Sequence, residues 1–266
     1  MEKRICLVSC SGGKDSTATL LLALEKMENV EAVFADTGNE HRLTYEYLDY
    51  LEQKLKIRIR RIKADFSKKI ERHHQYIRFC TEELKIKPLT EYALSLVEKG
   101  WFVESWQGVR AEESPSRANL PEREMLADGI EAVRPIHKWS VKQVFDYHRE
   151  KGIEPNPLYK MGMKRVGCMP CIHSRKQELA EIALRFPEVI DRIESWEKHV
   201  GQVSKRDFST FFPAEGHTNK EAYESGNIRK VVQWAKGAEP VFFKDFWKSE
   251  EDLSKNSCSS EYGLCE

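Results

Sequence analysis

Apolar and polar positions follow a regular alternation of strand-like and helix-like segments in the first half of the chain. The helix expected across Lys14–Met27 is apolar on most of its surface, and Leu48, Leu51 and Leu55 lie on one face of the next helix. The expected strands are the short apolar runs "RICLVSC", "EAVFAD", "IRIRRI", "WFVESW" and "EAVRPI". Repeated strand–helix units of this kind predict an α/β fold with a doubly wound, mainly parallel, five-stranded sheet.

The pattern changes after about Pro155. Cysteines, glycines and prolines cluster in "NPLYKMGMKRVGCMPCIHS", and a helical region follows in which Leu179, Ile182 and Phe186 share one face. The tail "SKNSCSSEYGLCE" is polar and rich in small residues, but it carries two cysteines. We therefore predict an α/β domain over residues 1–160 and a helical, cysteine-rich subdomain over residues 161–266.

Composition narrows the class of protein. The 266 residues carry 43 basic and 43 acidic side chains, so no global field attracts nucleic acid or an anionic membrane. No apolar stretch approaches the length of a membrane span, and "MEKRICLVSC" leads directly into a strand without the apolar run of an export signal. We therefore expect a soluble, cytoplasmic protein. Seven cysteines in such a chain favour metal ligation, redox chemistry or core packing over disulfides, with Cys6 and Cys10 expected in the core.

The segment "SGGKDST" joins the first expected strand to the first expected helix. Glycines at such a join let backbone N–H groups surround phosphate oxygens, and a helix N-terminus favours anions. Lys14 adds positive charge, and Asp15 could either orient Lys14 or reach a magnesium ion. The expected phosphate-binding residues are Ser11, Gly12, Gly13, Lys14, Asp15 and Ser16.

This loop differs from the two commonest nucleotide-binding patterns. Val8 stands where the Walker motif requires its first glycine, Asp15 follows the lysine, and the G-x-G-x-x-G fingerprint is absent. A γ-phosphate-cleaving NTPase and a dinucleotide-binding protein are therefore not supported. In "FADTGNE", Asp36 and Thr37 follow the second strand, where they could reach an adenosine or ribose group at the same edge of the sheet.

Three segments together resemble the PP-loop ATP pyrophosphatase superfamily: "SGGKDS", "DTG" and "WQGVRAEESPSR" near the fourth strand. Within it the chain is most similar to the phosphoadenosine phosphosulfate (PAPS) reductase group, over roughly residues 3–175. The resemblance implies an adenine nucleotide alpha hydrolase-like fold that binds an adenine nucleotide, with the pyrophosphate in the glycine loop. Family members that cleave ATP between the α and β phosphates keep an intact "SGGKDS". The intact loop of this chain therefore favours ATP activation over reduction of a ready-made adenylyl sulfate.

The segment "GVRAEESPSR" places Arg110 and Arg117 around a turn that also holds Glu112 and Glu113. Arginine binds phosphate oxygens bidentately and stabilises the charge of a departing pyrophosphate. From the residues alone, a solvated, self-paired charged loop stays open. The resemblance implies a nucleotide site that includes Gly108, Arg110, Ser114 and Arg117.

Two cysteines in "GCMPC", Cys168 and Cys171, can meet at one metal centre, but a tetrahedral site needs further ligands. "RFCTEELKIKPL" resembles the segment of the reductase group that carries a cluster-binding cysteine pair, with Phe79 in place of the first cysteine and Cys80 as the second. The resemblance implies a [4Fe–4S] cluster, whereas structural zinc or a C-x-x-C redox pair stays open from the spacing.

The fourth ligand must come from elsewhere. Cys265 in "YGLCE" is the candidate, and Cys258 or His173 are alternatives. Reductases of the group also carry a catalytic cysteine near the C-terminus, so Cys265 could be a nucleophile instead of a ligand.

Three hypotheses for the function follow. In the first, Mg-ATP is cleaved at the α–β bond to adenylate an acceptor, in sulfur transfer or nucleic-acid modification, with Lys14, Asp15 and Arg110 as catalytic residues. In the second, the chain reduces PAPS or adenylyl sulfate with thioredoxin and Cys265. In the third, it is a non-catalytic nucleotide- and cluster-dependent subunit that binds nucleic acid through the basic stretch around Arg58–Arg61. The acceptor, a sulfur donor and a homo-oligomeric state stay open.

Overall fold

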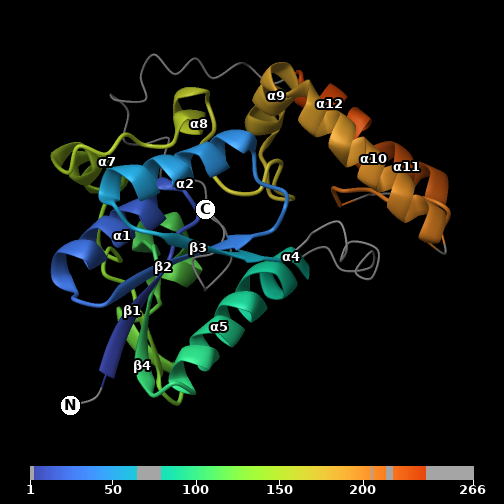
Figure 1. Ribbon diagram of the computed structural model, residues 1–266. Coiled ribbons are helices and arrows are strands. Elements are labelled where there is room, and N and C mark those ends of the chain that lie inside the picture. Colours follow the sequence, from blue (N-terminus) through green and yellow to red (C-terminus); the bar gives the residue numbers. More distant parts are fainter. Residues whose placement is uncertain (1–2, 65–78, 205, 214–217, 238–266) are drawn as a thin grey trace.

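A computed structural model of the chain describes residues 3–64, 79–204, 206–213 and 218–237. Its sheet has six strands in the order β3-β2-β1-β4-β6-β5, and all neighbours pair in parallel except β5, which runs antiparallel to β6 (Figure 1). The strands are β1 Lys3–Ser9, β2 Val30–Asp36, β3 Ile59–Lys63, β4 Trp101–Trp106, β5 Arg123–Ala127 and β6 Ile130–Val133. The mainly parallel α/β fold predicted from the sequence is confirmed.

The predicted number of five strands was wrong, because the edge strand β5 was missed. Its residues "REMLA" are almost all exposed, including Met125 and Leu126. An edge strand that buries neither face has no alternation of apolar and polar residues, and a periodicity argument cannot find it. Arg123 holds this strand in place by bonding Glu131 on β6 through two nitrogens, at 2.9 and 2.6 Å.

Helices cover both faces of the sheet, as a doubly wound fold requires. Along β1, Cys6 and Val8 point into a core formed with the first two long helices, whereas Ile5 and Leu7 point into a second core on the opposite face. The helices of this half are α1 Lys14–Lys26, α2 Arg42–Leu55, α4 Phe79–Thr81, the π-helical turn η1 Glu82–Ile86, α5 Lys87–Val97, the 3-10 turn η2 Ala111–Glu113, α6 Pro115–Ala118 and α7 Val141–Glu150. Cys6 and Cys10 belong to the first core, which confirms core packing as their role.

The C-terminal part is helical, as predicted. Its elements are α8 Pro157–Lys160, α9 Lys176–Arg185, α10 Pro187–Val203, α11 Asn219–Gly226 and α12 Ile228–Ala235. Helices α8, α9, α10 and α12 surround a third core that includes Leu179, Ile182, Ile193 and Ile228, and Figure 1 shows the helices of this part together. Helices α9 and α10 meet at Pro187, which stands at the first helical position of α10. Among the described helices, none combines the length and apolar character of a membrane span.

Candidate functional site

The loop between β1 and α1 lies at the carboxyl edge of the parallel strands and ends at an N-terminus without a side-chain cap. Gly13 is the N-cap residue, and no side chain bonds the first N–H groups from that position. Gly12 has φ +80°, and a Cβ there would lie 3.1 Å from Thr44 Cγ2, so glycine is required for both conformation and space. The hydroxyls of Ser11 and Ser16 lie 3.1 Å apart at the opening of the loop. The local geometry therefore suits an anion near the start of α1.

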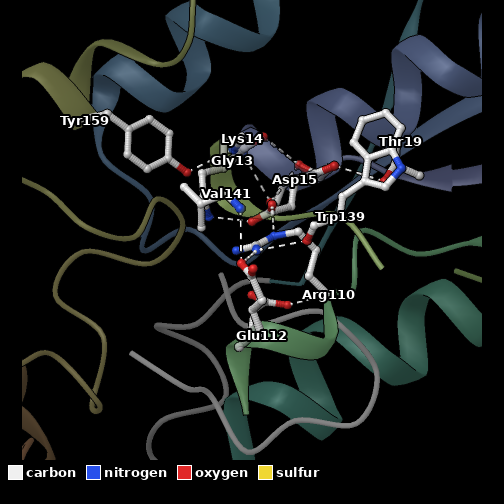
Figure 2. Close-up of polar contacts among 12 residues, drawn as sticks. Gly13, Lys14, Asp15, Thr19, Arg110, Glu112, Trp139, Val141 and Tyr159 are labelled. Carbon is white, nitrogen blue, oxygen red and sulfur yellow. Dashed lines mark hydrogen bonds and ion pairs between the residues drawn. The ribbon is translucent and has the colours of Figure 1, made fainter. Parts of the chain in front are cut away.

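A buried set of three charges stands behind this loop (Figure 2). Asp15 is fully buried and accepts from Lys14 Nζ at 2.5 Å through one carboxylate oxygen and from Arg110 Nε at 2.6 Å through the other. Burial alone would raise the pKa of Asp15, but the Lys14 and Arg110 cations hold it well below its usual range. Asp15 thus contacts Lys14 and Arg110 together, and its role toward a magnesium ion stays a prediction.

Arg110 is fixed from several sides. Its Nη1 donates to Glu112 Oε2 at 2.8 Å, and its backbone N–H donates to Glu113 Oε2 at 2.9 Å. Burial would lower the pKa of Arg110, but Asp15, Glu113 and Glu112 raise it above its usual value. The guanidinium therefore remains charged and has one orientation.

Arg117 and Gly108 complete the surroundings of Arg110. Arg117 is fully buried and paired with Glu113, and Ser114 Oγ accepts from the Arg117 backbone N–H at 3.2 Å. A Cβ on Gly108 would lie 2.8 Å from the backbone of Asp15, so the end of β4 packs directly against the first turn of α1. The charged segment is self-paired, as one alternative expected, but its two arginines are buried and only Glu112 is exposed among the four charged residues.

Three side chains that the sequence did not single out hold the loop from a distant segment. His148 Nε2 bonds the Lys14 carbonyl at 2.7 Å, Asn156 Nδ2 donates to the Gly12 carbonyl at 3.2 Å, and the Tyr159 hydroxyl accepts from the Lys14 N–H at 2.9 Å. All three are about 1% exposed. They stand more than 130 positions away along the chain, so no local pattern could identify them.

Asp36 and Thr37 occupy the turn after β2 but face different partners. Asp36 accepts from the Tyr45 hydroxyl at 2.6 Å and from the Gly38 N–H at 3.1 Å. Thr37 is fully buried, donates to Glu40 Oε1 at 2.7 Å and lies 3.6 Å from Cys168 Sγ. The turn thus lies at the edge of the sheet that carries the glycine loop, and it also contacts the C-x-x-C segment Cys168–Cys171, called the cysteine segment below.

Three of the four proposed metal ligands line one cavity. Cys80, Cys168 and Cys171 surround it together with Lys85 and Arg165, and it measures about 30 Å³, room for roughly one or two water molecules. Burial raises the pKa of Cys168 to about 12. His173 lines the same cavity, whereas the alternatives Cys258 and Cys265 lie outside the described residues.

The ligand set is incomplete in the part of the chain that the structure describes. There, no three His, Cys, Asp or Glu side chains are arranged to hold a metal ion. Cys80, Cys168 and Cys171 nevertheless line the same cavity, and thiols are the residue type that binds zinc and iron–sulfur clusters.

The basic stretch around Arg58–Arg61 is largely paired. Arg60 Nε bonds Glu31 at 2.6 Å, and Arg61 pairs with Asp49 and, at 3.2 Å, with Glu52. Much of the positive charge that could face a nucleic acid backbone is therefore neutralised by neighbouring carboxylates.

Comparison with known proteins identifies relatives over most of the chain. Residues 5–174 match the family model described as the phosphoadenosine phosphosulfate reductase domain. An uncharacterised 37.8 kDa protein of Escherichia phage 186 is 39% identical over 100% of this chain and 98% of its own length. An uncharacterised protein of Methanocaldococcus jannaschii is 30% identical over 77% of this chain, which spans only 43% of that relative. A phosphoadenosine 5'-phosphosulfate reductase of Buchnera aphidicola is 29% identical over 60% of this chain and 68% of its own length.

Proposed function

This chain belongs to the phosphoadenosine phosphosulfate reductase domain family, and from that premise we propose that it is an ATP pyrophosphatase that transfers an adenylyl group. It binds Mg-ATP at the glycine loop and cleaves the bond between the α and β phosphates. The observation that carries the proposal is the intact loop, whose Lys14 pairs with the buried Asp15, which in turn pairs with Arg110 (Figure 2).

In the proposed reaction an acceptor oxygen attacks the α-phosphorus. The bond from that phosphorus to the bridging oxygen breaks, and pyrophosphate leaves with the electron pair. Magnesium would neutralise part of the charge on the phosphates. The acceptor belongs to a sulfur-transfer or nucleic-acid-modifying reaction.

The loop residues and Arg110 have different roles in this reaction. The hydroxyls and backbone of Ser11–Ser16 surround the phosphate oxygens, apart from the Lys14 N–H, which bonds Tyr159, and Lys14 Nζ supplies a cation at the same place. Asp15 and Glu112 hold Arg110 by Nε and Nη1, which fixes the guanidinium on the carboxylate that also holds Lys14, and its charge stabilises the departing pyrophosphate. Asp15 uses both oxygens on these cations, so it acts as a positioning residue and Lys14 and Arg110 act on the phosphates.

Cys80, Cys168 and Cys171 hold a metal centre in this proposal, with a [4Fe–4S] cluster as the first identity and zinc as the alternative. The convergence of the three thiols on one cavity supports it. Such a centre would bind or relay the sulfur that displaces the adenylyl group.

Product analysis tests the reaction. Purified chain incubated with Mg-ATP should form AMP and pyrophosphate, separable from ADP and phosphate by anion-exchange chromatography. Lys14→Met should abolish turnover, whereas Lys160→Met, which removes an exposed lysine paired with Glu154, should retain it. Formation of ADP alone would overturn the proposal.

Metal analysis tests the second centre. Chain purified without oxygen should carry iron and sulfide, or zinc, and Cys168→Ser and Cys171→Ser should each lose that metal. Cys10→Ala alters a core cysteine outside the cavity and is the matched control. Cys10→Ala should retain the metal, and metal retained by Cys168→Ser and Cys171→Ser as well would exclude these two thiols as ligands.

A reductase of adenylyl sulfates is the second candidate, favoured by the Buchnera aphidicola relative and by similar proteins named phosphoadenosine 5'-phosphosulfate reductase. Release of sulfite from PAPS with thioredoxin, abolished by Cys265→Ser, would select this activity over ATP cleavage.

A further inference from the structure

The turn after β2 is bound directly to the backbone of the C-x-x-C segment. The Met169 N–H donates to the Asn39 carbonyl at 2.8 Å, and Asn39 Nδ2 donates to the Pro170 carbonyl at 3.2 Å. Glu40 and Cys168 form an isolated antiparallel bridge beside them. Asn39 is 1% exposed, so these bonds are made away from solvent, where a lost partner is costly.

Arg192 on α10 adds hydrogen bonds to this contact from the side of the C-terminal helices. Its Nη2 donates to Asn39 Oδ1 at 3.0 Å and to the Met169 carbonyl at 2.6 Å. One nitrogen therefore joins the side chain of the turn to the backbone of the C-x-x-C segment.

The surroundings of Arg192 leave it little freedom to move away. The guanidinium lies over the Trp196 ring at 5.3 Å from the centroid, and within the described residues its Nε is buried without a hydrogen-bond partner. Burial lowers the pKa of Arg192, and the nearby Tyr45 and Glu40 raise it. A cation held at a desolvation cost depends strongly on the two acceptors that it does reach.

We propose that Arg192 is a positioning residue that couples nucleotide binding to the cysteine segment. The inference rests on the proposed function and adds to it that the adenosine group of the bound ATP contacts Asp36 at the start of the turn, as the sequence predicts. A nucleotide that restrains this turn also restrains Asn39, and through Arg192 it restrains Met169 between the two cysteines. Because such coupling is reciprocal, a centre bound by Cys168 and Cys171 strengthens nucleotide binding by the same factor.

Amide hydrogen exchange measured by mass spectrometry tests this coupling. The intact chain, as purified, is compared with and without saturating Mg-ATP in peptides that cover residues 9–18 and 163–174. In the parent, ATP should slow exchange in both peptides, by about fivefold or more at the Met169 amide, the lower end of couplings between sites. In Arg192→Gln the slowing at 9–18 should remain, and the slowing at 163–174 should fall to less than half of that in the parent, the remainder passing through the direct bonds of Asn39 to Met169 and Pro170.

Two further variants separate this role from a general loss of stability. Arg229→Gln removes an arginine of α12 that bonds Asp191 and Glu194 on the exposed side of α10, the helix that carries Arg192. This variant should behave as the parent. Arg192→Lys keeps the charge but cannot reach both acceptors in the same geometry, so it should also lose most of the coupling. Each comparison is made with and without ATP in one variant, so a uniform change in stability cancels.

The outcomes are distinct. If ATP slows exchange at 9–18 but never at 163–174 in the parent, the coupling is overturned and the proposed nucleotide site stands. If the slowing at 163–174 is as large in Arg192→Gln as in the parent, the coupling does not run through Arg192. If ATP slows exchange in neither peptide, nucleotide binding itself fails and the inference fails with it.

Discussion

The glycine loop, Ser11–Ser16, and the cysteine segment, Cys168–Cys171, differ in how many polar contacts the neighbouring residues make with their functional side chains. Around the loop, Asp15 is paired through both oxygens and Arg110 through two side-chain nitrogens, and Asp15 and Arg110 are both buried. Around the cysteine segment, three thiols share a small cavity and the described residues provide no complete ligand set. If both bind ligands as proposed, the glycine loop is organised before its ligand arrives, whereas the three thiols need a further metal ligand.

Acidic groups in the two halves show the same contrast. In the loop, neighbouring cations hold the pKa of Asp15 below its usual range despite burial. In the C-terminal helices, burial raises the pKa of Glu197 to about 7, because its partners are backbone N–H groups of Phe211 and Ile228 and no cation opposes burial strongly enough. Ionisation of Asp15 therefore stabilises the fold, whereas ionisation of Glu197 opposes it.

The largest expected effect is that of Asp15→Asn, which breaks the charge set of the loop. It leaves Arg110 buried with a neutral neighbour, and removal of one partner from a buried pair costs roughly 3–5 kcal/mol. Because Glu112 still contacts Arg110, we expect about 3 kcal/mol, measured as the free energy of unfolding in urea.

Asp146→Asn is the control for this prediction, since Asp146 pairs with Lys142 and Arg149 on the exposed face of α7. It should leave the unfolding midpoint nearly unchanged. Equal stability of Asp15→Asn and the parent would show that the charge set does not stabilise the fold.

Glu197→Gln should change how stability depends on pH. The folded carboxyl binds its proton more tightly than the unfolded one, with pKa values of about 7 and 4.5. Its contribution to stability is therefore present below about pH 4.5 and is lost as the pH rises to about 7. Between these values the parent should lose up to about 3 kcal/mol that Glu197→Gln keeps, measured by urea unfolding at a series of pH values. Parallel curves for the two proteins would contradict the shifted pKa.

Gly108→Ala should disturb the glycine loop without changing any charge. The new Cβ would lie 2.8 Å from the Asp15 and Ser16 backbone, which cannot yield as a side-chain end can. We expect a loss of about 2 kcal/mol of stability, within the range for overpacked sites, together with weaker ATP binding by calorimetry. Gly237→Ala, whose nearest contacts are 3.7 Å or longer, should change neither quantity. Unchanged ATP affinity in Gly108→Ala would separate this contact from the nucleotide site.

The smallest effect is expected outside both sites, at the basic strand β3. Arg60→Gln removes an exposed pair with Glu31 and should change the unfolding free energy by less than about 1 kcal/mol. Retention of DNA or RNA at several salt concentrations should also be unchanged, because this charge is already neutralised. A marked loss of retention would instead support the hypothesis of a nucleic-acid-binding subunit.

Local features of the sequence were sufficient to predict the loop but not its support. Gly12, Gly13 and Lys14 could be assigned because a glycine turn before a helix has a conformation that neighbouring residues determine. The contacts of His148, Asn156 and Tyr159 depend on how distant segments pack, and those residues form no motif. The edge strand β5 escaped prediction for a related reason, since its exposed residues carry no periodic signal.

For the cysteine segment, the sequence alone was not sufficient to predict the ligand set or the metal. Resemblance to a family, not spacing, linked Cys80 to Cys168 and Cys171, and the structure places all three at one cavity. Spacing alone cannot distinguish zinc from iron–sulfur, because both are held by thiolates. The prediction that Cys265 supplies the fourth ligand lies outside the described residues.

The contacts of Asn156 and Tyr159 also determine where the chain can be divided. A chimaera that joins the sheet of this protein to the helices of a relative at residue 155 would separate the glycine loop from two groups that bind its backbone at Gly12 and Lys14. A graft made after residue 160 would keep those bonds, but it would move Tyr159 away from the apolar neighbours of the C-terminal helices. The two halves are therefore poor interchangeable modules, and any exchange must carry α8 and the core around it as one piece.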